Sequence, residues 1–591
     1  MQDTDFRKVR LEKLKKIRAL GWNPYASSFD KKQTIADALK NEGQKVKTAG
    51  KIFSYREHGN IAFADLKDES GKIQLFFQKK LLGENYKNLK LLDIGDYIGV
   101  EGEVIKTTAG EISIAPTSYT LLTKSLLSLP SEFFGLKDTE TRYRQRYLDL
   151  LLNSDLRERF NKRTKMVSAI REYLDNLGFW EVETPTLQHL YGGANAKPFK
   201  THVNVLNRDM YLRIADELYL KRLIVGGYER VYEICKDFRN EGIDATHSPE
   251  FTMIEWYEAY TDYQRVMDTA EGLFKHIAKK MYGHMTLTVD NKKIDIGRKW
   301  PRIEMSVILK EKVGLDVEKE TVESLLAYAK KNCKGMEIVG GETKGQLIFA
   351  IFEYKIPKLL IDPTWIIDYP EDVSPLSKSH PSKPGWVERF EGYVGGKEIC
   401  DGWSELTDPQ VQRQRFTKDF NIARKDREEV QMLDEDFLTA MEYGMPPLGG
   451  IGIGIDRLAE FFTNTWVIKN VILFPMIRSV EQKGLKKENQ NNKNIEKTSM
   501  TRKDAYELLT KHISLKNLVK HCIACEAAMK RIYKFLHAKD FDTEIEKQWG
   551  ITGLLHDVDY EMAQKENKLD KHGMLFFEKN PNVIPEPIVH A

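Results

Sequence analysis

Hydrophobic positions, among them β-branched and aromatic residues, are interspersed with polar ones in two neighbouring runs near the middle of the chain, residues 230–238 and 250–257. Runs of this kind predict two β-strands, and the Gly, Asn, Asp, Ser and Pro residues between them predict a loop. Side chains two residues apart share a strand face, so acidic and aromatic groups should lie together. The expected group is Phe251, Met253, Glu255 and Tyr257, with Arg239, Glu241 and His247 at the base of the loop. The pattern alone fits either a ligand site or an amphipathic hairpin with solvated charges.

A second strand pattern occupies residues 45–125, where five short runs are separated by glycine and polar turns. Five short strands favour a small closed barrel of the OB type, whose face often binds single-stranded nucleic acid. Residues 5–20 predict a helix with Val9, Leu11, Leu14 and Ile17 as its apolar stripe. Its basic residues fit a solvated face, with weak phosphate contact as the alternative.

Helical spacing returns over residues 160–177, followed by a predicted strand over 179–184 that ends before a proline. Farther on, Gly395 and Gly396 predict the turn of a hairpin within residues 389–406. This turn would place Glu391 and Glu398 roughly opposite each other. Facing carboxylates repel, so a bound cation, typically Mg²⁺, is the simplest explanation. Gly402 would then form a bulge that brings residues of both parities into one pocket.

Composition narrows the class of protein. The 591 residues exceed one hydrophobic core, so two to four domains are expected, and a net charge of +3 restricts nucleic-acid contacts to local patches. Five scattered cysteines favour a reducing compartment, and the single CxxC, Cys522 and Cys525, predicts packing residues rather than a zinc site. No signal core and no run of ~20 apolar residues is present. We therefore expect a cytoplasmic protein without a membrane segment.

Three separated motifs resemble those of one enzyme family. They are the helix and strand over 160–185, the run Phe238-Arg239-Asn240-Glu241 with His247 and Pro249-Glu250-Phe251, and the glycine-rich strand 449–454 followed by Asp456-Arg457-Leu458. Together they resemble the class II aminoacyl-tRNA synthetases, subclass IIb, and in detail the lysine-specific branch, over roughly residues 1–480. The resemblance implies lysine activation by ATP and transfer of lysine to tRNA(Lys), by a homodimer.

The resemblance also implies a role for each site residue. Arg239 and Arg457 would be catalytic, holding the α- and γ-phosphates of ATP, and Glu391 and Glu398 would hold Mg²⁺. The remaining nucleotide contacts would come from Glu241, His247, Phe251 and Gly452. The lysine pocket would consist of Glu217, Glu255, Tyr257, Asp401, Trp403 and Glu405. The anticodon-binding positions of the barrel would be Arg56, Phe63, Gln74 and Glu111.

Three positions depart from the lysine branch, which usually has Pro at 216, Asn at 401 and Phe or Tyr at 403. Asp216, Asp401 and Trp403 therefore leave the amino-acid specificity partly open. The acidic pocket argues against an aspartate or asparagine ligase. The barrel argues against a lysyltransferase that acts on a translation factor, because such an enzyme would be expected to lack it. A catalytically inactive RNA-binding regulator is disfavoured by the intact set of phosphate and metal residues.

Beyond residue 478 the resemblance ends. Residues 479–500 are polar, rich in Asn and Lys, and predict a flexible linker. Residues 501–591 predict a helical unit in which His521 and the adjacent His556 and Asp557 resemble the metal ligands of the HD phosphohydrolase family. A divalent transition metal is expected there, with His572 and His590 as additional candidates. The family's final aspartate ligand would lie farther downstream, so we expect a truncated unit.

The expected fold class is α+β. It combines an N-terminal OB-fold barrel, an antiparallel synthetase sheet with flanking helices, and a C-terminal all-α HD-like domain. The expected domains are a helical extension (1–44), the barrel (45–125), a linker (126–150), the catalytic domain (151–478), a flexible linker (479–500) and the HD-like domain (501–591).

Overall fold

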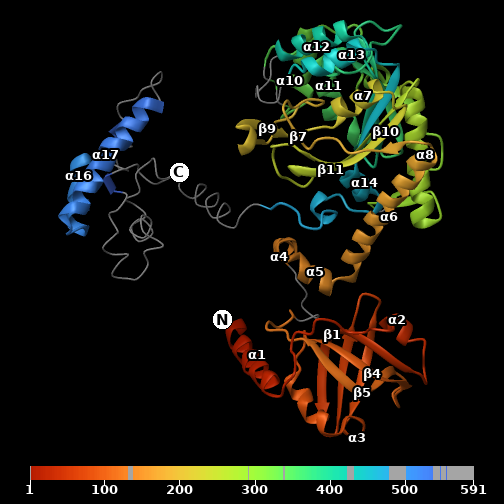
Figure 1. Cartoon of the computed structure of the whole chain (residues 1–591). Coiled ribbons are helices and arrows are strands. Elements are labelled where there is room, and N and C mark those ends of the chain that lie inside the picture. Colours follow the sequence, from red (N-terminus) through yellow and green to blue (C-terminus); the bar gives the residue numbers. More distant parts are fainter. Residues whose placement is uncertain are drawn as a thin grey trace. The chain divides into compact units, whose positions relative to one another are not determined.

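The chain divides into two units, Met1–Ile477 and Arg478–Ala591. The computed structural model describes residues 2–130, 138–290, 292–336, 338, 340–421, 432–477, 501–536, 546–547 and 554–555 (Figure 1).

The N-terminal part of the first unit is a closed barrel with strand order β1-β2-β3-β5-β4. Alternate residues of β2 and β3 are buried, as period-two sequence patterning requires, so the predicted five-stranded barrel is confirmed. A short helix and a 3₁₀ turn, α3 (Lys79–Leu82) and η1 (Gly83–Leu91), connect β3 to β4. The barrel strands are β1 Lys45–His58, β2 Ile61–Lys67, β3 Lys72–Gln78, β4 Tyr97–Lys106 and β5 Ile112–Thr123.

Helix α1 (Gln2–Ala19) and the short α2 (Ile35–Ala38) precede and border the barrel. The predicted apolar stripe of α1 is wrong at Val9, which is 56% exposed. Arg10 is buried instead, and its guanidinium donates to the backbone oxygens of Leu127 at 2.6 Å and Ile94 at 2.9 Å. Carbonyl groups thus satisfy a buried charge that hydrophobic periodicity alone assigns to solvent.

The rest of the first unit is organised around an eight-stranded sheet of order β14-β15-β16-β17-β18-β11-β10-β6. Its central pairs are antiparallel, as predicted, whereas the edge pairs β14–β15 and β6–β10 are parallel. The strands are β6 Trp180–Glu181, β10 Arg230–Phe238, β11 Glu250–Ala259, β14 Arg302–Glu304, β15 Thr364–Pro370, β16 Trp386–Val394, β17 Lys397–Ser404 and β18 Leu448–Gly454. Smaller sheets contain β7 Leu187–Gln188, β8 Lys200–Val203, β9 Arg208–Leu212, β12 Thr286–Val289 and β13 Lys292–Asp295.

One face of this sheet carries the main hydrophobic core. Ile254 and Trp256 of β11 point into it and pack with residues of α6, α8 and α14. Helices α6 and α8 lie side by side in Figure 1. Ile254 and Trp256 are therefore structural, which leaves Met253, Glu255 and Tyr257, between and beside them, for the opposite face. The helices are α6 Ser154–Asn176, α8 Tyr263–Tyr282 and α14 Ile455–Phe462.

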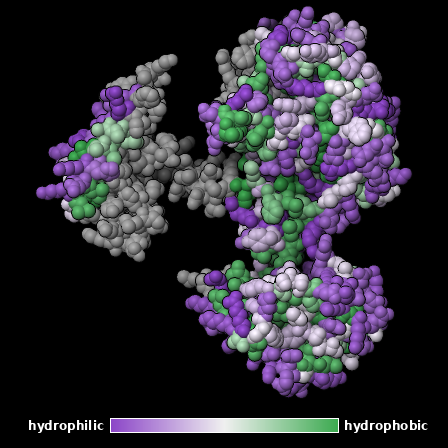
Figure 2. All heavy atoms as spheres, viewed as in Figure 1, coloured by the Kyte–Doolittle hydropathy of each residue, from purple (hydrophilic) through white to green (hydrophobic). Residues whose placement is uncertain are grey.

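The remaining helices form smaller clusters around the sheet. One cluster joins α9, α10 and α11 to β15 and β16, and another joins α7, α12 and α13 to β10 and β11. Hydrophilic residues cover much of the face shown in Figure 2. These helices are α4 Thr139–Arg144, α5 Arg146–Leu152, α7 Glu217–Val225, α9 Met305–Val313, α10 Val322–Asn332, α11 Lys344–Lys355, α12 Pro409–Asn421 and α13 Glu435–Glu442.

The described part of the second unit is helical, with α16 (Arg502–His512) and α17 (Lys516–Leu536). Ala505, Leu509 and Cys522 share a small core with Leu554 and Leu555, which confirms Cys522 as a packing residue. The HD-like fold of this unit stays a prediction. Among the residues that the structure describes, no helix is long and apolar enough to cross a membrane.

Candidate active site

A row of acidic residues crosses the face of the sheet opposite the main core. Strand register pairs Glu391 with Asp401, Asp401 with Gly452, and Gly452 with Glu255. Above this row lies a cavity of about 420 Å³, and its walls contain every predicted catalytic-domain site residue except Glu405. The glycine at the centre of the row leaves space that a side chain would occupy.

The hairpin of β16 and β17 brings the predicted metal residues to one wall, but not through the predicted pairing. Glu391 lies opposite Asp401, and Glu398 lies opposite Tyr393. The register skips Ile399, so the bulge is there and the predicted bulge at Gly402 is wrong. Because of this extra residue, the side chains of Glu398 and Asp401, three positions apart, lie on the same face of the sheet, and both line the cavity.

A third carboxylate joins this pair. Burial, and then the charges of Glu391 and Glu398, raise the pKa of Glu353 on α11 to about 7. Burial likewise raises the pKa of Glu391 to about 8, although Arg389 donates to it at 2.8 Å. Such an excess of carboxyl groups fits a divalent cation. Glu353 was not predicted, and its only sign in the sequence is that an acidic residue stands within an apolar helix.

The residues predicted to contact phosphate and adenine cluster at the β10–β11 loop and the start of α14. The Arg239 guanidinium lies 5.1 Å from the centre of the Phe251 ring, and its Nε donates to the Ile214 oxygen at 3.3 Å. Arg457 donates to Glu398 at 2.8 Å. Glu241 and His247 are exposed on the loop. The cations thus reach the cavity with donors left over for a ligand.

The other end of the cavity is acidic, yet Glu217, which lines it, and Glu405, behind its wall, are already paired with a cation of the chain. Buried Lys221 forms ion pairs with Glu217, one helical turn before it, and with Glu405. Glu405 also accepts from Trp403 Nε1 at 2.7 Å. Sequence analysis missed Lys221, although its four-residue spacing from Glu217 was a readable signal.

Arg389 of β16 is a second cation of the chain that pairs with a carboxylate of the cavity. Its Nε and Nη2 donate to the two carboxylate oxygens of Asp401, both at 2.9 Å. Burial outweighs this partner and raises the pKa of Asp401 to about 6. Arg389 was not predicted, although it lies two residues before Glu391 and therefore on the same strand face.

Glu255 has no cation partner among the ion pairs of the described residues. Its Oε2 accepts from the Tyr257 hydroxyl at 2.9 Å, and burial followed by the Glu217 charge raises its pKa to about 8. Gly450 is required beside it, because an added Cβ would lie 2.3 Å from the Tyr257 ring and 2.5 Å from Glu405. This end is therefore tightly packed and retains an unneutralised acid.

The predicted anticodon residues lie along one row on the barrel. Phe63 pairs in register with Arg56 on β1 and with Phe76 on β3, and its ring stacks on that of Phe76 at a centroid distance of 4.9 Å. Two residues from Phe76, Gln74 accepts from Ser113 at 2.9 Å. Glu111 is exposed just before β5. The stacked Phe76 was missed.

The predicted HD metal residues receive limited description. His521 is exposed on α17, with its Nε2 3.6 Å from the Cys525 sulfur. His556, Asp557, His572 and His590 lie outside the described residues. The metal site of this unit stays a prediction.

Comparisons with known proteins agree with this geometry. Residues 138–478 match the family model of the tRNA synthetases class II (D, K and N), and residues 46–122 match that of the OB-fold nucleic acid binding domain. Lysine–tRNA ligase of Carboxydothermus hydrogenoformans is 48% identical over 478 residues, which cover 80% of this chain and 97% of the relative. Lysine–tRNA ligase of Thermoanaerobacter pseudethanolicus is 47% identical, covering 80% and 95%. Lysine–tRNA ligase 2 of Methanosarcina mazei is 46% identical, covering 79% and 93%. The chain belongs to the class II tRNA synthetases (D, K and N).

Proposed function

We propose that the chain is a lysine–tRNA ligase, which activates L-lysine with ATP and transfers it to the 3′ end of tRNA(Lys). The observation that carries the proposal is the acidic row across the sheet. After Lys221 and Arg389 have neutralised part of it, Glu255 still faces the cavity without a cation partner among the described ion pairs. A substrate with two ammonium groups supplies the missing positive charge.

The nucleotide would bind at the opposite end of the cavity. Arg239 contacts the α-phosphate, Arg457 the γ-phosphate, and Phe251 stacks on adenine, while Glu241, His247 and Gly452 surround the nucleotide. Arg239 and Arg457 are then the catalytic residues, since preorganised cations stabilise the charge that develops at phosphorus.

Glu391 and Glu398 would hold Mg²⁺, and their carboxylate oxygens suit this ion. When bound, Mg²⁺ neutralises phosphate charge. Arg457, which pairs with Glu398 in this structure, would exchange part of that contact for the γ-phosphate.

Lysine would bind between Glu217, Glu255, Tyr257, Asp401 and Trp403. Glu405, behind the wall, acts on this pocket through Lys221 and Trp403. An aspartate ligase needs a free cation at this place, and the two cations near it are held by their own carboxylates.

The barrel row would bind the anticodon. Phe63 and Phe76 offer a stacking surface, which tolerates any base, while Gln74 and Glu111 can read base edges and Arg56 can meet a phosphate. The exposure of this row supports the assignment.

Three further proposals complete the description. The chain forms a homodimer, supported by the exposed Trp180, Val205 and Leu206, which are 67%, 90% and 60% exposed. It works in the reducing cytoplasm, supported by five free cysteines. The C-terminal unit holds a divalent transition metal at His521, His556 and Asp557.

Amino-acid-dependent ATP–pyrophosphate exchange tests the central proposal. With all twenty amino acids compared at equal concentration, lysine should support exchange far above the others. Exchange that is strongest with aspartate or asparagine would overturn the proposal, as would the absence of exchange with every amino acid.

A further inference from the structure

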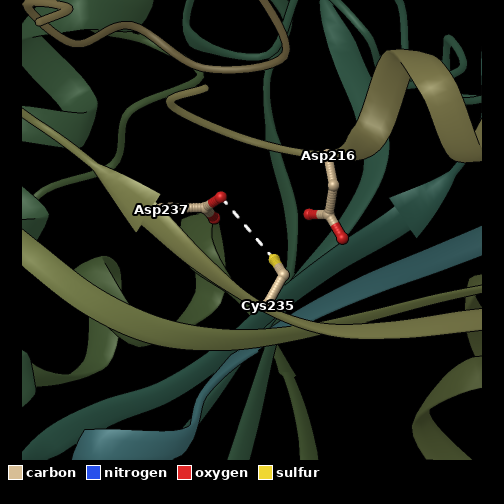
Figure 3. A group of neighbouring side chains, drawn as sticks. All are labelled: Asp216, Cys235 and Asp237. Atoms are coloured by element: carbon tan, nitrogen blue, oxygen red, sulfur yellow. Dashed lines mark hydrogen bonds between the residues drawn. The ribbon is translucent and has the colours of Figure 1, made fainter. Parts of the chain in front are cut away.

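Three side chains form a buried cluster beside the cavity, at the start of α7 and on the adjoining strand β10. Asp216, Cys235 and Asp237 point toward one another (Figure 3), and their ligand atoms all lie within 4.8 Å of one another. They are 1%, 6% and 0% exposed. None of them lines the cavity above the acidic row. The cluster is therefore separate from the proposed substrate and magnesium positions.

Hydrogen bonding leaves this cluster unsatisfied. No N–H or O–H donor reaches either carboxylate oxygen of Asp216 or Oδ2 of Asp237. Asp216 instead meets the carboxyl group of Glu255, and two carboxyl groups form a hydrogen bond only by sharing a proton. The Cys235 sulfur is 3.7 Å from Oδ1 of Asp237. A buried carboxylate without a donor or cation costs several kcal/mol, so native proteins rarely leave one in that state.

Nearby cations do not complete the cluster. Arg213 approaches Asp237 at 3.4 Å, but the same guanidinium makes its shorter contact, 2.6 Å, with Glu233. On the other side lies the Glu255 carboxyl group, which adds negative charge next to Asp216. The charges of Arg239 and Arg213 act on Asp237, whereas no ion pair of the described residues includes Asp216, so the Asp216 end of the cluster is where positive charge from a bound ion would act.

We propose that Asp216, Cys235 and Asp237 bind one zinc-type transition-metal ion, with a water molecule as the fourth ligand. Tetrahedral zinc, with sulfur at about 2.3 Å and carboxylate oxygen at about 2.0–2.2 Å, places its ligand atoms ~3.4–3.7 Å apart. The Cys235 sulfur and Oδ1 of Asp237, 3.7 Å apart, already match this spacing, and the Asp216 carboxylate, within 4.8 Å of both, would move toward them by up to about 1 Å on binding. Mg²⁺ is disfavoured because it binds oxygen ligands, whereas the Cys235 thiol loses its proton to the solvent and binds as a soft thiolate.

The site would hold one wall of the amino-acid pocket in place. Asp216 directly precedes Glu217, and on β10 Cys235 pairs in register with Met253, which lines the cavity. A metal ion would thus connect the first turn of α7 to the strand pair β10–β11. The sequence resemblance implies proline at position 216, which offers no carboxylate, so the proposed site depends on Asp216 of this chain.

Metal analysis of the purified full-length chain tests the proposal. Wild type and Cys333→Ser, which alters a buried cysteine elsewhere, should each hold one more equivalent of zinc than Cys235→Ser. Asp216→Pro introduces the residue that the resemblance implies, so it should fold and also lose that equivalent. For the ligand variants, affinity should fall by at least the ~10–100-fold that loss of even an outer ligand partner costs.

Cobalt substitution supplies a second measurement. Co²⁺ added to the metal-free full-length chain should give thiolate-to-cobalt charge-transfer absorption that is weaker in Cys235→Ser and unchanged in Cys333→Ser. This comparison separates the site from magnesium, which has no thiolate ligand, and from any metal in the C-terminal unit, which retains its own cysteines. Equal zinc content and equal cobalt spectra in wild type and Cys235→Ser would overturn the proposal. Asp216 and Glu255 would then share a proton instead.

Discussion

In both the barrel row and the acidic cavity, the register of neighbouring strands places the side chains. Register alone accounts for the barrel row, but not for the cavity. On the barrel, Arg56, Phe63 and Gln74 are exposed or half-buried, and the register between β1, β2 and β3 places them on one face without interruption near them. In the cavity, a bulge at Ile399 and buried cations decide which carboxylates are free. An exposed site is thus specified by periodicity, whereas a buried site also depends on which charges are paired.

This difference has energetic consequences. Water solvates each exposed side chain of the barrel row, so replacing one should affect RNA binding alone. In the cavity, the charges that we propose to bind the substrate also affect folding, because every unpaired buried charge carries a desolvation cost. Variants of the barrel row should therefore change RNA binding alone, whereas variants of the cavity should change both substrate binding and stability.

The largest effect should come from Lys221→Met. The change leaves Glu217 and Glu405 buried without their cation, and loss of one member of a buried ion pair costs about 3–5 kcal/mol of unfolding free energy. Denaturant unfolding measures it. Lys280→Met, which removes an exposed ion pair with Glu172, is the matched control and should cost about 0–1 kcal/mol. Equal stability of the two variants would mean that the buried carboxyl groups are protonated.

Arg239→Ala should follow in size. Removal of one preorganised charge-stabilising donor lowers the rate of adenylate formation by roughly 10²-fold or more. Pyrophosphate exchange with lysine measures this rate, and Arg56→Ala on the barrel should leave it unchanged. Near-normal exchange by Arg239→Ala would remove Arg239 from the catalytic machinery and weaken the contrast between the two regions.

The sequence predicted features that depend on neighbouring residues and did not predict those that depend on distant contacts. Short runs of β-branched and aromatic residues between turn residues predicted the barrel and the β10–β11 hairpin, and the two-residue repeat of a strand predicted the face that carries Glu255 and Tyr257; the structure confirms each. Glycines located the β16–β17 turn, where Gly395 and Gly396 both have positive φ. These features depend on neighbours in sequence, so local patterns contain them.

The missed features depend on contacts between distant segments. The side chain of Arg10 is buried because carbonyl groups of residues 94 and 127 meet it, and no pattern within α1 indicates that. The bulge at Ile399 depends on how β17 pairs with both of its neighbours. Lys221 and Glu405 are far apart in sequence, so only the fold reveals that the chain itself neutralises part of the pocket.

Phe63→Ala should have an intermediate effect confined to RNA. Loss of one base stack weakens tRNA binding by about 1–3 kcal/mol, measured as a higher KM for tRNA in lysine charging. Pyrophosphate exchange without tRNA should stay at the wild-type rate. Tyr97→Ala, an exposed aromatic of β4 outside the row, is the control and should change neither measurement. Equal losses in both assays would make Phe63 structural, and the contrast with the cavity would fail.

The smallest effect should come from Asp401→Asn, although the residue lies within the acidic row. An asparagine oxygen still accepts a hydrogen bond from Arg389, and Glu391 retains the other contact of that guanidinium. We expect lysine activation to persist with a modest rise in the KM for lysine. Burial raises the pKa of Asp401 to about 6, so its charge is present above that pH and is progressively lost below it. The ratio of variant to wild-type KM should therefore be largest near pH 8 and approach one near pH 5. A ratio that does not change with pH would show that the Asp401 charge plays no part in lysine binding, and abolished activation would show that the substrate is not simply lysine.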